Sequence, residues 1–332
     1  MHMDIFNDDA FSVVSLTKAI EDMPSVPGRI GQLGLFSEEA ISTTSVSIEK
    51  QGNALTLVGA APRGSSGQTA ARDKRQMLTL NCIHLPQYDS VNADEIQNVR
   101  AFGSETDVET IQRVTNKRLT RMRRDLDVTL EFQRMGAING VVLDSDGTTV
   151  LENLHTRFGT SPATMNMVLG TAGTNVKQKV VEAKREMRDS LGGLTIRGYR
   201  AMCSTSFFDA LVAHAKVEAS YDRWMNGEFL RSDQTELGFY FAGVFWEEYD
   251  GSVGAQEFIA PGTAKLIPEG VPDLFVTHFA PADYMETVNT MGQAYYAKQW
   301  AKDGNKGIHI ESQSNPIHIC TRPQVPITLL AA

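Results

Sequence analysis

Apolar and polar residues alternate on both sides of a glycine- and serine-rich segment near the start of the chain. The outward run covers 46–48 and 55–58, the returning run covers 77–80, and residues 62–68 lie between them. Alternation with a period of two on both sides of such a tip predicts a long two-stranded hairpin over residues 45–85. Because an isolated hairpin is only marginally stable in water, we expect this arm to reach the surface of another subunit.

The strongest helical pattern follows at residues 105–137. Thr106-Asp107-Val108-Glu109 predicts a capping box at its start, and Gly136 with Asn139-Gly140 predicts its end. A helix of about 30 residues would be roughly 45 Å long. Apolar or small residues recur along it at close to helical spacing, at Val108, Ile111, Thr115, Leu119, Met122, Leu126, Leu130 and Ala137.

Shorter elements are predicted on either side of this helix. Residues 10–20 carry a short amphipathic pattern inside an N-terminal arm. Residues 141–151 predict a second hairpin, because Asp-Gly at its turn tolerates positive φ. Residues 174–191 predict a helix with Thr174 as its cap, and Gly192-Gly193 predicts its end.

The second half of the chain predicts many strands and one more helix. That helix begins at Ser204 or Thr205 and runs to Ala215. Short apolar runs between turn residues predict strands at 194–196, 199–203, 239–241, 244–246, 258–259, 265–267 and 275–276, and in the tail at 308–310, 317–319 and 327–330. The fold class is therefore α+β.

The composition and charge of the chain exclude several classes of protein. The 332 residues are enough for a sizeable core and two domains, and the formal net charge of −9 argues against tight wrapping of nucleic acid, which needs a basic surface. No apolar run approaches the roughly 18 residues of a membrane span, and the acidic N-terminus lacks the regions of a signal peptide. Three widely separated cysteines indicate a reducing compartment without a disulfide framework.

Two segments resemble ligand-binding loops but lack the residues that such loops need. A calcium loop beginning at Asp144 would require Gly and Glu where Thr149 and His155 stand, so a hairpin turn is the better interpretation. The segment 170–174 precedes a helix, yet no Gly-Lys-Ser/Thr follows it, so we expect a connector rather than a phosphate site.

Histidine and cysteine give no firmer signal for chemistry. The spacing of His309, His318 and Cys320 matches no zinc pattern, and alternating strand positions explain it. Cys203 has no recognisable partner pattern around His214, so a buried thiol on a strand is the better interpretation. We therefore expect no catalytic residue, no metal and no cofactor.

The long helix also carries a basic stripe, which is the one candidate for nucleic-acid binding. Acidic residues at Asp125, Asp127 and Glu131 interrupt it, and no aromatic residues are interleaved with it. This pattern favours a charged face that meets solvent or another subunit. The stripe consists of Arg113, Lys117, Arg118, Arg121, Arg124 and Arg134.

The order of these elements resembles the major capsid proteins of tailed bacteriophages, in the coat-protein-E family typified by the lambda phage head protein. The resemblance covers residues 35–332 and rests on order and spacing. The segments that carry it are Arg63-Gly64-Ser65-Ser66, Met77-Leu78-Thr79-Leu80 with Leu85-Pro86, the helix 106–136, the strand and helix over 195–215, the turn and strand at 258–264, and the final strand at 326–330.

The resemblance implies a Hong Kong 97-like capsid fold in five parts. These are an N-terminal arm at 1–44, an extended loop at 45–85, a peripheral domain at 86–165 with its spine helix at 105–137, an axial domain at 166–305, and a returning peripheral strand at 306–332. Basic residues cluster around the Gly/Ser-rich loop tip, and we expect this tip to dock on an acidic patch of a neighbouring subunit. The predicted interface residues are Arg63, Gly64, Arg72, Lys74 and Arg75.

The implied function is that of a structural subunit of an icosahedral phage head, without enzymatic activity. Hexamers and pentamers of the chain would enclose double-stranded DNA without reading its sequence, with a portal protein and a decoration protein as partners. A separate scaffolding protein is expected because no long charged helical domain precedes the arm. The expected locations are the virion and, during assembly, the host bacterial cytoplasm.

Two other functions stay open at this point. An encapsulin-like nanocompartment of the same fold would hold an enzyme cargo instead of DNA, and the contents of expressed particles would distinguish it. An α+β enzyme with an unfamiliar site would show convergent ionisable residues in a pocket, and the sequence gives no sign of them.

Overall fold

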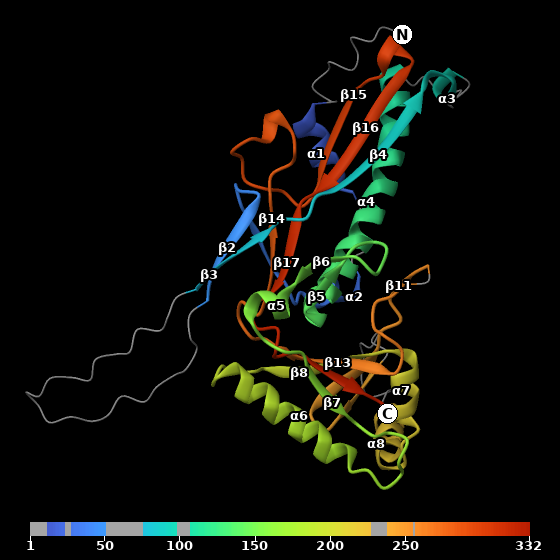
Figure 1. Cartoon of the computed structure of the whole chain (residues 1–332). Coiled ribbons are helices and arrows are strands. Elements are labelled where there is room, and N and C mark those ends of the chain that lie inside the picture. Colours follow the sequence, from blue (N-terminus) through green and yellow to red (C-terminus); the bar gives the residue numbers. More distant parts are fainter. Residues whose placement is uncertain (1–11, 24–27, 51–75, 98–106, 227–237, 255) are drawn as a thin grey trace, which may run out of the picture. The chain divides into compact units, whose positions relative to one another are not determined.

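A computed structural model of the chain describes residues 12–23, 28–50, 76–97, 107–226, 238–254 and 256–332 (Figure 1). The chain divides into two compact units, each built from three segments. Unit 1 contains Met1–Val46, Leu80–Arg134 and Val276–His318, and unit 2 contains Ser47–Thr79, Met135–Phe275 and Ile319–Ala332.

Unit 1 is built around the long helix and a three-stranded antiparallel sheet that runs beside it (Figure 1). The helix is α4 (Asp107–Asn139), so the predicted spine helix is confirmed, although Thr106 of its capping box lies outside the described residues. In the sheet, β16 (Gly307–Ser314) lies between β15 (Tyr296–Ala301) and β4 (Leu85–Asn92). The short helix α3 (Ala93–Gln97) follows β4.

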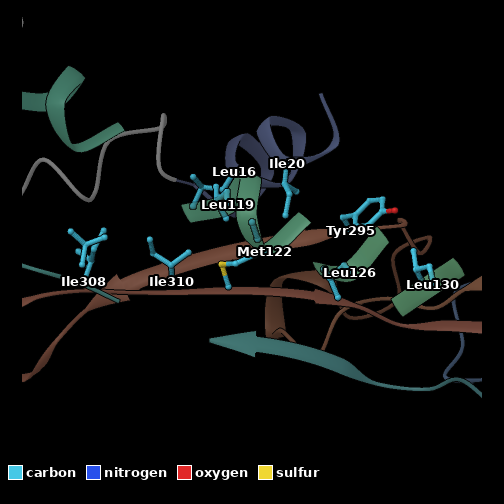
Figure 2. Close-up of a cluster of buried hydrophobic side chains, with 11 residues drawn as sticks. Leu16, Ile20, Leu119, Met122, Leu126, Leu130, Tyr295, Ile308 and Ile310 are labelled. Carbon is cyan, nitrogen blue, oxygen red and sulfur yellow. The ribbon is translucent and has the colours of Figure 1, made fainter. Parts of the chain in front are cut away.

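The core of unit 1 joins α4, this sheet and the N-terminal helix α1 (Val13–Glu21). Ser12 caps α1, because its side chain accepts a hydrogen bond from the N–H of Ser15. Figure 2 shows Leu16 and Ile20 of α1 beside Leu119 and Met122 of α4, with Ile308 and Ile310 of β16 nearby. The buried cluster contains Leu16, Ile20, Val91, Leu119, Met122, Leu126, Leu130, Tyr295, Ala297, Ile308 and Ile310. Burial of each large apolar side chain stabilises the fold by about 1.5–3 kcal/mol.

A second sheet begins with the segment that follows α1. After the short helix α2 (Arg29–Leu33), strand β1 (Ser37–Ala40) pairs in parallel with β14 (Phe275–Phe279). The third strand of this sheet is β17 (Pro316–Cys320). Two single-turn 3₁₀ segments, Met285–Thr287 and Asp303–Asn305, lie in the loops before and after β15.

The stem of the predicted hairpin is present. Strands β2 (Ser45–Lys50) and β3 (Gln76–Asn81) form a two-stranded sheet, and the N–H of Cys82 donates to the carbonyl of Thr44 at its base. The predicted run at 55–58 and the loop tip lie outside the described residues.

The described part of unit 2 contains a mixed six-stranded sheet and four helices. Its strand order is β7 (Ala163–Asn166), β18 (Ile327–Leu330), β13 (Thr263–Glu269), β8 (Gly198–Cys203), β10 (Val244–Glu248) and β9 (Gly238–Phe241). Two short hairpins are β5 (Val141–Leu143) with β6 (Val150–Asn153) and β11 (Ser252–Val253) with β12 (Gln256–Glu257). The helices are α5 (Leu154–Phe158), α6 (Val176–Leu191), α7 (Thr205–Val212) and α8 (Ala215–Asn226).

The strongest predictions for unit 2 are confirmed. The turn of the β5–β6 hairpin is held by Asp146, whose carboxylate accepts hydrogen bonds from the Thr149 hydroxyl and from the N–H groups of Thr149 and Thr148. These bonds lower the pKa of Asp146. Helix α6 ends at Gly192, which takes the predicted left-handed conformation with φ of 62°.

Four local predictions are wrong. Asn175, and not Thr174, caps α6; the Thr174 hydroxyl instead donates to the carbonyl of Val168. Residues 194–196 form no strand, because pairing with β13 begins only at Arg197, whose N–H reaches the carbonyl of Glu269. The helix predicted to Ala215 stops at Val212, and a new helix begins where the His214 ring accepts the N–H of Lys216. Residues 258–259 lie just beyond β12.

The predicted five-part domain division stays a prediction. The two units follow different boundaries, since each combines segments from distant parts of the chain. In particular, β18 shares a sheet with β8 and β13, whereas the prediction grouped residues 306–332 with 86–165. Likewise β15 pairs with β16 although the prediction assigned them to different parts.

Candidate functional site

The five residues predicted at the subunit interface, Arg63, Gly64, Arg72, Lys74 and Arg75, lie outside the described residues. The structure describes the stem that carries them. On the stem, Met77 is 73% exposed while Leu80 is fully buried. Met77 is therefore available for contact with another surface, whereas Leu80 is packed within the chain at the base of the stem.

The basic stripe of α4 is partly used within the chain. Arg118 forms ion pairs with Asp89 (3.3 Å) and Glu95 (2.7 Å), which links α4 to β4 and α3. Arg134 pairs with Glu38 of β1 at 2.5 Å. Lys117, Arg121 and Arg124 are exposed. The stripe thus combines two residues that form internal ion pairs with three that face solvent.

A buried charged cluster beside the stripe fixes α1 to α4. Arg123, only 7% exposed, donates through Nη1 to the carbonyl of Ile20 at 2.6 Å, and its Nε pairs with Asp127 at 2.9 Å. The Tyr295 hydroxyl donates to the same carboxylate at 2.6 Å, and the guanidinium carbon lies 3.6 Å from the centre of the Tyr295 ring. Burial and the neighbouring carboxylate raise the pKa of Tyr295.

Glu131, one helical turn further along α4, holds the start of α2. Its carboxylate accepts hydrogen bonds from the N–H groups of Ile30 (2.6 Å) and Gly31 (3.2 Å). A negative charge is favourable at this end of a helix, where backbone N–H groups lack internal partners. A Cβ at Gly28 would collide with the Glu131 carboxyl group, so a larger residue there would displace this carboxylate from the start of α2.

Arg134, further along α4, contacts β1 and the residue that precedes it. Its guanidinium carbon lies 5.9 Å from the centre of the Phe36 ring, and Phe36 packs edge-on against His318 of β17. His318 is fully buried, and its Nδ1 lies 2.8 Å from the Thr277 hydroxyl. Burial, with a smaller contribution from the charge of Arg134, holds the pKa of His318 well below its ordinary value.

We call Arg123, Asp127, Glu131 and Arg134 the anchor cluster. Arg123, Glu131 and Arg134 hold the end of α1, the start of α2 and β1 against α4. All four side chains line a cleft of about 360 Å³ in unit 1. This role was not predicted from the sequence, in which Asp127 and Glu131 interrupt a basic face. Their spacing of four, four and three residues was the available signal, because it places them on one side of a helix, as it does for an apolar stripe.

Unit 2 contains a comparable buried charge. Arg200 of β8 pairs through Nη1 with Glu247 of β10 (2.9 Å) and through Nε with Glu269 of β13 (2.5 Å). Its guanidinium carbon lies 4.7 Å from the centre of the Phe245 ring. Here the ion pairs connect strands that already share backbone hydrogen bonds.

The remaining candidate residues are not brought together for chemistry. Cys203 is fully buried and its pKa is raised well above the ordinary value by burial, while the ring of His214 contacts the carbonyl of Thr171. His309 lies on β16, whereas His318 and Cys320 lie on β17 of another sheet. Among the described residues, no group of three or more His, Cys, Asp and Glu side chains could hold a metal ion.

The sequence model for the family described as phage major capsid protein E matches residues 12–330. The chain belongs to this family. The major capsid protein of Pseudomonas phage KPP10 is 29% identical, over 97% of each chain. The major capsid protein of Salmonella phage Felix O1 is 25% identical, over 97% of this chain and 96% of its own. No described helix is long and apolar enough to cross a membrane.

Solved structures support the fold that the family implies. The putative capsid protein of a prophage of E. coli CFT073 aligns with a TM-score of 0.61 at 13% identity, covering 96% of this chain and 99% of that one. The capsid of Ralstonia phage GP4 aligns with a TM-score of 0.53 at 11% identity, covering 91% and 89%. The Hong Kong 97-like α+β capsid fold is confirmed. This family member is a structural subunit of a phage head shell and a component of the virion.

Proposed function

We propose that this family member assembles into the hexamers and pentamers of an icosahedral head that encloses double-stranded DNA, and that it does so without catalysis. The net charge of −9 supports the DNA role, because an acidic lining lets packed DNA slide without sticking. A separate scaffolding protein, a portal protein and a decoration protein complete this proposal, with assembly in the host bacterial cytoplasm.

The hairpin stem is the observation that carries this proposal. Within the described residues, β2 and β3 pair with each other and with no further strand. Because a two-stranded hairpin is marginal by itself, the surface of a neighbouring copy would complete it. In a shell with many such arms, contacts that are weak individually would together give strong association.

Electron microscopy of the purified chain, with and without a co-expressed scaffolding protein, tests the assembly. We expect capsomers or closed shells, and shells from infected cells that protect double-stranded DNA from nuclease. A chain that stays monomeric at every concentration, even with its scaffold, would contradict the proposal. Particles filled with an enzyme would support the nanocompartment instead.

We further propose that the loop tip docks electrostatically on a neighbouring copy. Arg63, Gly64, Arg72, Lys74 and Arg75 would supply a basic tip in an acidic protein. Each exposed ion pair contributes only about 0.2–1 kcal/mol, so the effect would be collective.

Reversal of the tip charges tests this docking. The triple variant Arg72→Glu, Lys74→Glu and Arg75→Glu should fold normally by circular dichroism yet give fewer particles, most clearly at low salt, because salt screens the new repulsion. The matched control reverses three exposed basic residues of α6, Lys177, Arg185 and Arg188. Equal particle yields from the tip variant and the wild type at low salt would show that the tip does not dock by charge.

A further inference from the structure

The loop between β14 and β15 carries three exposed large apolar side chains within seven residues. Met285 is 87% exposed, Met291 is 60% exposed and Val288 is 58% exposed. Single exposed apolar residues are common on protein surfaces and need no explanation. A cluster of them in one short loop instead indicates a contact surface. We call these three residues the methionine patch.

The backbone beneath the methionine patch is held in place by hydrogen bonds. The hydroxyl of Thr287, which is 7% exposed, lies 2.8 Å from the Ala282 carbonyl and 3.0 Å from the Tyr284 carbonyl. The Thr290 hydroxyl donates to the carbonyl of Thr287 at 2.8 Å, and the N–H of Gly292 donates to the carbonyl of Ile41 at 2.8 Å. The loop is therefore ordered by its own contacts, and its outward side chains are presented on a fixed frame.

The inner side of the same loop is already occupied. Ala282 and Tyr284 are buried with Tyr296 of β15, and Val13 of α1 packs against them. The two methionines and Val288 are not members of this cluster, and they remain exposed. Their exposure therefore follows from the packing of the loop, because other side chains already fill its buried side.

One ion pair and one further carboxylate, that of exposed Asp283, lie beside the methionine patch. Lys298 pairs with Glu286 at 2.8 Å, and its Nζ also lies 4.9 Å from the centre of the Tyr284 ring. The three side chains of the patch are themselves uncharged. Two copies of a chain with a net charge of −9 repel each other, and an apolar patch is where close approach costs least.

We propose that the methionine patch is a contact surface for a second copy of this chain in the head shell. The family establishes the chain as a shell subunit, so its own copies are the partners that it meets everywhere. Methionine is unbranched and flexible, and it adapts to surroundings that differ in shape. This suits a surface that meets the same partner at different angles in hexamers and pentamers, a point that rests on the proposed function.

The first test replaces the patch with polar side chains of similar size. The triple variant Met285→Gln, Val288→Thr and Met291→Gln should unfold at the wild-type temperature but lower the particle yield about tenfold or more, because the lost apolar burial weakens every copy of the contact. Unlike the loss expected from reversed loop-tip charges, this loss should persist at high salt, because apolar contacts are not screened.

The matched control is Val128→Thr, Val150→Thr and Val253→Thr, at positions that are 42%, 53% and 50% exposed. It should assemble like the wild type. An equal loss of yield in the control, or a wild-type yield from the patch variant, would overturn the inference. If the wild type itself formed no shells, the proposed function would fail first, and the two failures would thus be distinguished.

A second measurement identifies the partner. A photoreactive amino acid at position 291, activated in assembled particles, should give crosslinks to another copy of the chain, located by mass spectrometry. Crosslinks that run only to a scaffolding or decoration protein would overturn the assignment to a second copy.

Discussion

Arg123 and Arg200 are both buried arginines with carboxylate partners, yet they hold different kinds of structure together. Arg123 ties α4 to the end of α1, a segment that precedes it by 103 residues and shares no backbone ladder with it. Arg200 crosses strands that are already joined by backbone hydrogen bonds. The comparison teaches that α1 is held, within the described part of the chain, only by side-chain contacts, apolar and charged, whereas the strands around Arg200 also share backbone hydrogen bonds.

The largest effect is expected at Arg200, because its loss removes the guanidinium group that pairs with a deeply buried carboxylate. Arg200→Ala would leave Glu247, whose side chain is 3% exposed, without its guanidinium partner. The expected loss is about 3–5 kcal/mol in the free energy of unfolding. Urea unfolding of unassembled subunits measures it, with Arg197→Ala as an exposed control that should change stability by less than about 0.5 kcal/mol. A loss as small as that of the control would show that the carboxylate tolerates burial without Arg200.

A smaller and more local effect is expected at Arg123. In Arg123→Ala, Asp127 keeps the Tyr295 hydroxyl as a donor, so we expect a loss of about 2 kcal/mol. Hydrogen exchange should accelerate in α1 while β8 stays protected. The neighbouring Arg124→Ala, at an exposed position of the same helix, provides the control. If α1 stayed protected in Arg123→Ala, the apolar contacts of Leu16 and Ile20 alone would hold it.

The smallest effect is a pH dependence within unit 1. The pKa of His318 is held well below its ordinary value, so the folded state resists protonation that the unfolded state accepts. Stability is therefore fully present above about pH 6.5 and falls below it, by up to about 1.4 kcal/mol per pH unit for this group. His318→Gln should reduce this slope between pH 6.5 and 5, measured by urea unfolding at each pH. An unchanged slope would assign the dependence to other groups.

Local patterns were sufficient to predict the longest elements. The helix α4 could be predicted because its apolar positions repeat over 33 residues, and the buried positions Leu119, Met122, Leu126 and Leu130 confirm that stripe. The hairpin stem could be predicted from alternation alone. Thr174 and Asn175 are both good caps, and only the Val168 carbonyl, which binds the Thr174 hydroxyl, decides between them.

Contacts between residues far apart in the chain could not be predicted from local sequence patterns. The anchor cluster depends on carbonyl and N–H groups of Ile20, Ile30 and Gly31, which any residue would offer, so no side-chain pattern marks them. Leu194 belongs to an apolar triplet that resembles a strand, but a strand also needs a neighbour, and pairing with β13 starts later. The predicted interface at the loop tip remains a prediction, because it lies outside the described residues.

The place of β18 has a consequence for the order in which the subunit matures. In the sheet, β18 lies between β7 and β13, in register with Ala163 on one side and with Leu266 on the other. Among the described strands, β18 is the one that pairs with β7, so β7 stays unpaired during synthesis until the ribosome has passed Ile327. Such late, long-range pairing is slow. Unit 2 therefore completes this sheet only after residues 327–330 are made, and a nascent subunit would be unable to join a shell with a finished sheet before that point.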